Sequence, residues 1–199
     1  MKKFLSIMVM LSLAVVVCRP VCAQNKDTHV DEKLQAVQEL YNYYTELEDV
    51  TGIHISSSML ELLSVFSEGT DVTLDDFAVD DMTVVNHMDL KKLKSLYILV
   101  ADNAKSASEM TKSANHNILK RFGDYIELLQ ISNIEEDVTF YYSSPDGQYV
   151  DDLLMLQAEK DPENSKKVLS VTMIYMQTDS LAMRDIIGLA GSMGMNPAE

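Results

Sequence analysis

The sequence predicts an α+β fold, most simply a two-layer sandwich in which amphipathic helices pack on one face of a mainly antiparallel sheet. Two observations carry this prediction. From Tyr125 onward, four successive segments alternate apolar and polar residues with a period of two, which is typical of half-buried strands. Before Tyr125, apolar strands alternate with segments of helical period, so helices are available to cover the sheet.

The first helix is expected to begin at Asp31, after a polar and mobile start over 24–30. Its apolar residues recur at steps of three and four, the period of a helix that buries one face. These residues are Leu34, Val37, Leu40, Tyr41, Tyr44 and Leu47. Because two of the three tyrosines over 41–44 lie on this stripe and Tyr43 lies off it, they are interpreted as core packing rather than as a stacking platform.

A short strand over 50–55, introduced by Gly52, is expected to lead into a second helix. Ser58 with Glu61 three residues later has the pattern of a capping box, so the helix is expected to start there and to end at Gly69.

The stretch 68–81 carries six acids and no basic residue. A loop with short pieces of structure is expected here, extending to about Asp89. Aspartate-rich loops supply the hard oxygen ligands that calcium prefers, so an acidic calcium-binding module is one alternative function. The Asp-x-Asp-x-Asp-Gly spacing of the known calcium loop is absent from the sequence, which favours a solvated loop instead.

A strongly apolar strand over 96–100 precedes a third helix. Ser106 with Glu109 is read as its capping box, and Gly123 as its stop. One face of this helix carries Met110, Ala114, Ile118 and Phe122.

The second half of the chain reads as an antiparallel meander. Its four strands are expected over 125–132, 137–143, 149–158 and 167–177. Pro, Asp and Gly over 144–147 predict a tight hairpin turn, and a second turn is expected over 161–164. Asp179 or Ser180 is then expected to cap a final helix that carries Leu181, Ile186, Ile187, Leu189 and Ala190.

Residues 1–23 have the three-part plan of a secretory signal peptide. Lys2 and Lys3 form the positive start, an apolar run over 4–17 follows, and a cleavage site ends at Ala23. The run is shorter than the about 20 residues that span a bilayer. We therefore expect cleavage and export to the periplasm or the exterior, with a single domain over 24–199.

Lipid attachment at Cys18 or Cys22 is the alternative, and the lack of a small residue before either one disfavours it. Cleavage after Ala23 removes both cysteines, so the mature chain could have no disulfide, thiolate nucleophile or Cys-ligated metal. Cleavage also removes three cations, which changes the formal charge from −15 to −18.

The charge of the whole chain excludes some partners. Its 199 residues include 16 Lys and Arg against 31 Asp and Glu. Nucleic acid and anionic lipid are disfavoured as partners, because both require clustered cations.

No catalytic, cofactor-binding or metal-binding residue is assigned from the sequence. His54 beside the serines of 56–58 suggests a hydrolase, but a Gly-x-Ser-x-Gly elbow is absent and serines before a helix are expected as caps. The histidines, at 29, 54, 87 and 116, lack the spacing of a zinc site. The acid pairs Asp151–Asp152 and Glu135–Glu136 are interpreted as exposed residues at or beside strand ends.

The chain resembles the bacterial secreted proteins grouped as domain-of-unknown-function family 4252. The resemblance covers about 40–190 and rests on apolar and turn residues, namely Tyr44, Val50, Ile55, Ser56, Met59, the strands at 96–99, 138–141, 153–156 and 171–174, and the turn at Asp146 and Gly147. It implies a small envelope protein, often a lipoprotein, whose gene often lies near those of extracytoplasmic-function sigma factors. It implies no active-site residue.

Three hypotheses follow. The first is a non-enzymatic secreted envelope protein that binds another protein or a small ligand, in envelope stress signalling. The second is a periplasmic hydrolase that uses a serine or paired carboxylates, and the third is the calcium-binding module. The first is favoured, because the sequence combines an export signal with the absence of any catalytic constellation. The exposed edges of an antiparallel sheet would suit a dimer or strand addition, although no residue singles this out.

Overall fold

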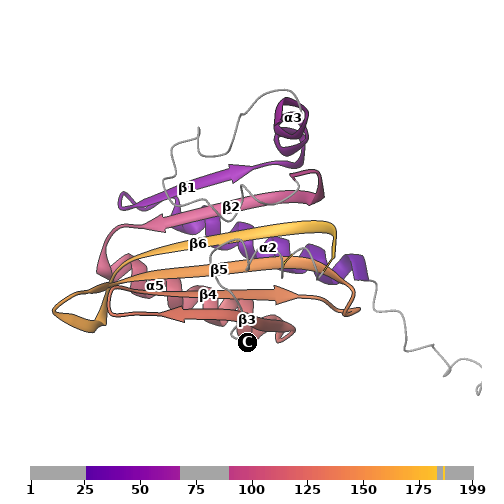
Figure 1. Cartoon of the computed structure of the whole chain (residues 1–199). Helices are drawn as coiled ribbons and strands as arrows, with labels where there is room; N and C mark the ends of the chain where they lie inside the picture. Colours follow the sequence, from indigo (N-terminus) through magenta and orange to yellow (C-terminus); the bar gives the residue numbers. More distant parts are fainter. Residues whose placement is uncertain (1–25, 68–89, 183–185, 187–199) are drawn as a thin grey trace, which may run out of the picture. The chain divides into compact units, whose positions relative to one another are not determined.

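The structure is a computed structural model that describes residues 26–67, 90–182 and 186 (Figure 1). The chain divides into two compact units, Met1–Glu32 and Lys33–Glu199. Of the first unit, residues 26–32 are described, and they form the first turns of helix α2 (Lys26–Tyr44). The strands of the described ranges and the candidate site all belong to the second unit.

The described strands form one six-stranded antiparallel sheet in the order β1-β2-β6-β5-β4-β3 (Figure 1). Their bounds are Val50–Ile55 for β1, Leu93–Ala101 for β2, Tyr125–Ser132 for β3, Glu136–Ser143 for β4, Tyr149–Asp161 for β5 and Asn164–Ala182 for β6. The last four strands are a meander, and β6 returns to pair with β2. β1 and β3 are therefore the two outer strands among those that the structure describes.

One face of the sheet packs against α2 and α5 (Ala104–Ala114), both of which lie behind the sheet in Figure 1. α5 continues directly into a short π-helical segment, η3 (Asn115–Lys120). Tyr97 and Leu99 of β2 point to this face, and the intervening Leu96 and Ile98 point to the other, as the alternation of a strand requires. The predicted sandwich of amphipathic helices on an antiparallel sheet is confirmed.

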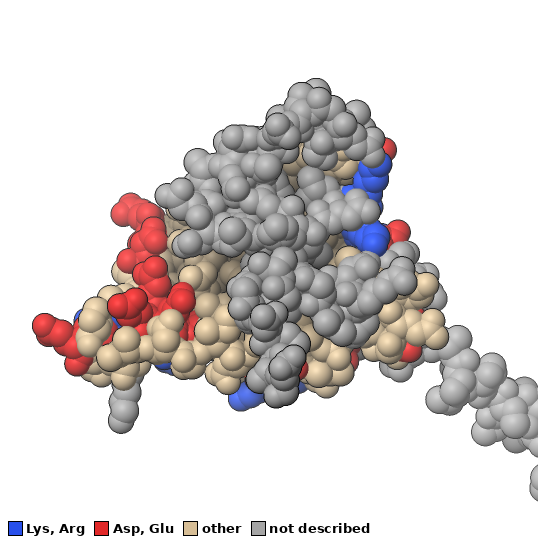
Figure 2. Space-filling model, in the orientation of Figure 1, with Lys and Arg blue, Asp and Glu red and all other residues tan. Residues whose placement is uncertain are grey.

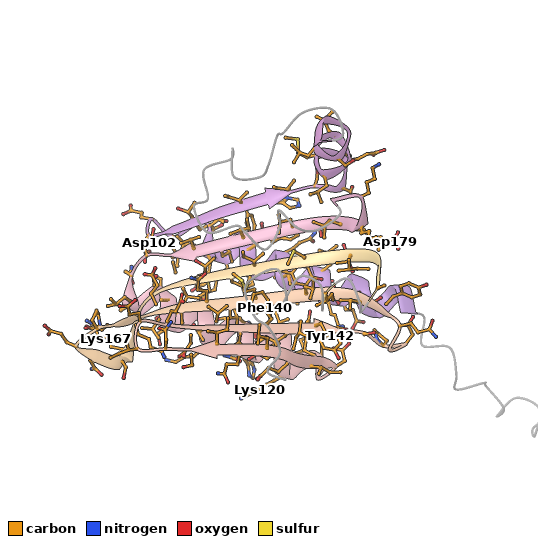
Figure 3. All side chains as sticks on the ribbon, in the orientation of Figure 1. Asp102, Lys120, Phe140, Tyr142, Lys167 and Asp179 are labelled. Atoms are coloured by element: carbon orange, nitrogen blue, oxygen red, sulfur yellow. The ribbon has the colours of Figure 1, made fainter. Side chains whose placement is uncertain are left out.

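The opposite face carries a second core. Leu60 and Leu63 of α3 (Ser57–Ser67) pack there with sheet residues that include Phe140, which Figure 3 labels near the middle of the sheet together with Tyr142 on the same strand. The sheet thus buries apolar side chains on both faces, and the sequence prediction had assigned helices to one face only.

The strand predictions are confirmed to within a few residues for β1, β3 and β4, whereas β2, β5 and β6 extend beyond their predicted ends. The predicted hairpin turn is present between β4 and β5. Asp146 Oδ1 accepts hydrogen bonds from the backbone N–H groups of Gln148 and Tyr149, at 2.9 Å each. Gly147 takes a φ of 69°, which a side chain would disfavour. Gly123 ends the third helix as expected, with a φ of 68°.

Three predicted helix starts are wrong. α2 begins at Lys26, so part of the expected mobile start is helical. α3 begins at Ser57 and not after Ser58. The N-cap of α5 is Asn103 rather than Ser106, and its Oδ1 accepts from the N–H groups of Lys105 at 2.9 Å and Ser106 at 3.0 Å. Asn and Ser cap equally well, so the sequence alone did not decide between them.

The predicted start of the final helix at Asp179 or Ser180 is also wrong, because β6 runs on to Ala182. Leu181 pairs with Val150, and Ala182 pairs with Tyr149 at the beginning of β5. Pairing with a neighbouring strand outweighs the local capping preference at this point. The rest of that helix, apart from Ile186, lies outside the described residues, as do the signal peptide, the acidic stretch 68–81 and Gly69.

Gly52 lies inside β1 rather than before it, and its position reflects a close approach by α2. A Cβ added to Gly52 would lie 2.9 Å from the ring of Tyr41 and would overlap the methyl group of Thr45. Tyr41 is itself held edge-on against Tyr97, with ring centroids 5.4 Å apart. The absence of a side chain at Gly52 lets the helix lie against the outer strand.

Gly52→Ala is therefore expected to lower the free energy of unfolding by about 1–3 kcal/mol, the usual cost of overpacking. Urea unfolding measures this change. In the matched control, Thr45→Ser removes the overlapping methyl group and keeps the hydroxyl that donates to the carbonyl of Tyr41. Combining the two substitutions is expected to recover part of the loss, and an unchanged stability of Gly52→Ala alone would contradict the packing argument.

Candidate functional site

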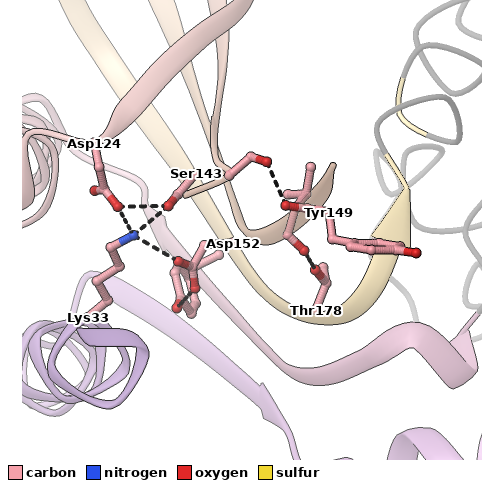
Figure 4. Close-up of polar contacts among 9 residues, drawn as sticks. Lys33, Asp124, Ser143, Tyr149, Asp152 and Thr178 are labelled. Carbon is pink, nitrogen blue, oxygen red and sulfur yellow. Dashed lines mark hydrogen bonds and ion pairs between the residues drawn. The ribbon is translucent and has the colours of Figure 1, made fainter. Parts of the chain in front are cut away.

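A buried group of polar side chains lies between α2 and the sheet (Figure 4). We call it the Lys33 cluster. It consists of Lys33, Asp124, Tyr125, Ser143, Asp152 and Tyr175.

Lys33 reaches the cluster because it lies on the buried face of α2. It precedes Val37 by four residues and Leu40 by seven, so all three share one side of the helix. The side chain is 1% exposed. A lysine is almost never buried to this extent unless its charge is paired.

The ammonium of Lys33 has three hydrogen-bond partners. It donates to Ser143 Oγ at 2.5 Å, to Asp152 Oδ2 at 3.3 Å and to the Asp124 carboxylate. Ser143 Oγ in turn donates to Asp124 Oδ2 at 2.9 Å. The dashed lines in Figure 4 follow this network from the helix to Ser143 on β4, to Asp152 on β5 and to Asp124, the residue before β3.

The strand register explains why these residues meet. Tyr125 is the direct partner of Ser143 across β3 and β4, and Ser143 is the direct partner of Asp152 across β4 and β5. Direct partners in an antiparallel pair point to the same face. Tyr175 on β6 lies beside Leu154, two residues along, and donates a hydrogen bond of 2.5 Å to Asp152 Oδ1.

Burial controls the acid–base state of the cluster. Asp152 is fully buried, and this burial raises the pKa of its carboxyl even though Lys33 and the Tyr175 hydroxyl act in the opposite direction. Burial also raises the pKa of Tyr175 and of Tyr125 well above the ordinary value, with the Asp152 charge adding to the effect. One lysine thus faces two carboxyl groups in a place that disfavours charge.

Two polar atoms of the cluster remain unsatisfied among the described residues. The Tyr125 hydroxyl and Asp124 Oδ1 are buried and have no hydrogen-bond partner there. The Tyr125 ring instead packs against the lysine, with Lys33 Nζ 4.9 Å from the ring centroid. Unsatisfied buried polar atoms are uncommon in folded proteins, so this arrangement requires a physical explanation.

Sequence reasoning missed this cluster, and one of its interpretations is wrong. Asp152 was expected to be exposed at a strand end, but it lies on the helix-covered face with Leu154. Asp151 is buried as well, at the irregularity in the pairing of β5 with β6. The available signal was Lys33, a cation at a position that the apolar stripe of α2 assigns to the core.

The suspected hydrolase residues are not assembled in the described ranges. His54 is exposed on β1, and its ring stacks on Tyr97 with centroids 4.2 Å apart and planes 8° from parallel. Partial desolvation lowers the pKa of His54. Ser56, Ser57 and Ser58 are exposed at the start of α3, and the described residues contain no hydrogen bond between them and His54.

The other sequence candidates are dispersed. His116 is exposed on η3, while Glu135 is exposed in the turn before β4. Glu136 Oε2 accepts from the Gln157 amide at 3.2 Å. Among the described residues, no group of three or more His, Cys, Asp or Glu side chains is arranged to hold a metal ion. Over the same residues, no helix combines the length and the apolar character needed to cross a membrane.

The raised pKa of Asp152 predicts a pH effect on stability. A folded-state pKa above the unfolded value means that the folded protein binds more protons here, so the stability from this group falls as pH rises from about 3.8 through the raised value. The free energy of unfolding should therefore fall more steeply with pH in the unsubstituted protein than in Asp152→Asn. Urea titrations across this range compare the two slopes, and equal slopes would contradict the prediction.

A family model described as a domain of unknown function, DUF4252, matches residues 43–189. No curated protein matches the chain. The matched range contains all six described strands and five residues of the Lys33 cluster, whereas Lys33 itself precedes the range.

Proposed function

The chain belongs to the DUF4252 family, and we propose that it is an exported, non-enzymatic binding module that takes up an extended segment of another envelope protein along the outer strand β3. The proposal rests on one observation, the exposed apolar surface of the outer strand β3. It is an outer strand of the sheet and carries an exposed apolar side chain, Ile126, which is 51% exposed. Ile134 is 67% exposed in the turn after β3, outside the strand itself, and therefore supplies a control position.

The composition of β3 supports this choice of edge. Outer strands are commonly protected by lysine or proline, and β3 contains neither, with Glu127 as its one charged residue. The other outer strand, β1, has no exposed large apolar side chain among the described residues. Strand addition uses the free backbone groups of such an edge for affinity and alternate side chains for specificity.

The charge of the molecule indicates the chemistry of the partner. Acidic side chains gather toward one end of the sheet in Figure 2, the end at which Figure 3 labels Asp102. β3 finishes close to two acids of the following turn and strand, Glu135 and Glu136. A segment with alternating apolar residues and a basic residue at its end would complement both the strand and these acids.

The experiment places a photo-crosslinking amino acid at Ile126 or at Gln130, two exposed positions of β3, in the protein expressed in its own cell envelope. We expect both positions to crosslink to the same segment of one protein. The two crosslinked partner residues should be as far apart in the partner's sequence as two residues that lie opposite Ile126 and Gln130 on a paired strand. Thr51, exposed on β1, is the matched control and should not capture that segment. Captured residues without a common spacing, or equal capture at Thr51, would contradict strand addition.

A further substitution tests affinity. Ile126→Asp places a charge on the edge and should abolish the crosslink from Gln130, whereas Ile134→Asp, in the adjacent turn, should leave it in place.

Native mass spectrometry of the recovered protein checks export, because the subunit should begin at Gln24. Turnover of a substrate that a single Ser or Asp substitution abolishes would overturn the non-enzymatic assignment.

A further inference from the structure

The Lys33 cluster contains the reactants of an amide-forming condensation, and this feature is independent of the proposed binding role of β3. An amine nitrogen, Lys33 Nζ, is held against the carboxyl group of Asp124. A second carboxyl, that of Asp152, touches the same nitrogen at 3.3 Å through Oδ2. We propose that Lys33 and Asp124 are a self-modification site, at which the folded chain forms an intramolecular isopeptide bond between Lys33 Nζ and Asp124 Cγ.

The hydrogen bonds distinguish the roles of the two carboxyl groups. Both oxygens of Asp152 are engaged, Oδ1 by the Tyr175 hydroxyl and Oδ2 by Lys33. Asp124 has one oxygen, Oδ1, without a partner among the described residues. Asp124 is therefore the acceptor whose carbon is attacked, and Asp152 is the neighbouring acid.

The reaction balances without any other reagent. A proton moves from the Lys33 ammonium to the carboxylate of Asp124, which leaves a neutral amine beside a carboxylic acid. The nitrogen lone pair forms the N–C bond to Asp124 Cγ, the nitrogen loses its second proton to the cluster, and the C–OH bond breaks. The Asp152 carboxylate takes this second proton from the nitrogen through Oδ2 and passes it to the departing hydroxyl, so the products are an amide and one water molecule.

Burial favours both the proton relay and the product. Burial raises the pKa of Asp152, so this carboxylate accepts a proton from the nearby nitrogen more readily than an exposed aspartate does. The condensation replaces a buried cation and a buried carboxylate by a neutral amide, which removes the desolvation penalty of two charges. Fixed contact between the groups supplies the effective concentration that free amines and acids lack in water.

The surroundings of Lys33 suit a neutral amine. The nitrogen packs over the Tyr125 ring, and the side chain is 1% exposed. The bond would tie α2 to the residue before β3, across 91 positions of the sequence. It would give a covalent crosslink to a mature chain that, after the expected cleavage, contains no cysteine to form a disulfide.

Intact mass spectrometry of the purified, unsubstituted chain under denaturing conditions tests the proposal without relying on a variant that folds. The expected mass is lower than that of the chain sequence by one water molecule, and digestion should yield a linked peptide pair that contains Lys33 and Asp124. The full sequence mass in protein that is folded by circular dichroism would overturn the proposal.

Three variants test the roles. Lys33→Arg keeps the charge but should show its full sequence mass. Asp124→Asn should lose ammonia instead of water, because the acceptor then carries an amide. Asp152→Asn should react more slowly or not at all, and a loss of ammonia from this variant would instead identify Asp152 as the acceptor and overturn the assignment to Asp124.

Discussion

Relative to the chain in which Lys33 and Asp124 are still an ion pair, replacing Lys33 by alanine is expected to lower the free energy of unfolding by about 3–5 kcal/mol, the usual effect of removing one partner of a buried ion pair. The substitution leaves Asp152 fully buried without its cation and deprives Ser143 and Asp124 of a hydrogen-bond donor. Urea unfolding at neutral pH measures the change, against unsubstituted protein whose intact mass shows that no water has been lost.

The comparison variant is Lys94→Ala. Lys94 forms an ion pair with Asp179 at 3.6 Å, but the two side chains are 51% and 64% exposed. Exposed pairs contribute about 0–1 kcal/mol, so this substitution should have little effect. Equal losses for Lys33→Ala and Lys94→Ala would mean that burial does not control the energetics of the Lys33 cluster.

A double substitution separates the contribution of the charge from that of the packing. Lys33→Met fills a similar volume without a charge, and combined with Asp152→Asn it removes the charge that would otherwise be left unpaired. We expect the double variant to be more stable than Lys33→Met alone, since well-packed neutral groups often replace a buried ion pair at little cost. A double variant as unstable as the sum of both singles would contradict this.

The meander was predictable because its signals are local. Each of β3 to β6 is indicated by residues within its own segment, and Asp146 with Gly147 defines the turn between β4 and β5 from within four residues. The final extent of β6 was not predictable in this way. It depends on Val150 and Tyr149, residues that lie far from Leu181 in the sequence.

The Lys33 cluster depends on contacts of still longer range. Lys33 is 91 positions from Asp124 and 119 from Asp152, so neither carboxylate signals its partner locally. With 31 acids in the chain, the sequence does not distinguish Asp152 from solvated carboxylates. A lysine in the apolar stripe of a helix was the one local indication that a buried carboxylate must exist elsewhere.

Leu154→Ala should produce the other large effect, a loss of about 2–5 kcal/mol in the free energy of unfolding. Leu154 is fully buried on β5, between Tyr141 of β4 and Tyr175 of β6, on the face that α2 and α5 cover. Because its neighbours are held by pairing on both sides, the sheet cannot collapse to fill the space, and the cavity adds to the lost transfer free energy.

Leu156 provides the matched control, since it follows Leu154 by two residues on the same strand and face but is only partly buried. Leu156→Ala should lower the free energy of unfolding by less, because surrounding water already reaches part of that side chain.

A second measurement, amide hydrogen exchange, connects the core to the Lys33 cluster. Leu154 lies two residues from Asp152 and beside Tyr175, so the cavity should loosen the Tyr175–Asp152 hydrogen bond. We therefore expect faster amide hydrogen exchange at Leu153 and Met176 in Leu154→Ala than in Leu156→Ala. Equal exchange rates in the two variants would contradict the predicted effect of the Leu154 cavity on the Tyr175–Asp152 hydrogen bond.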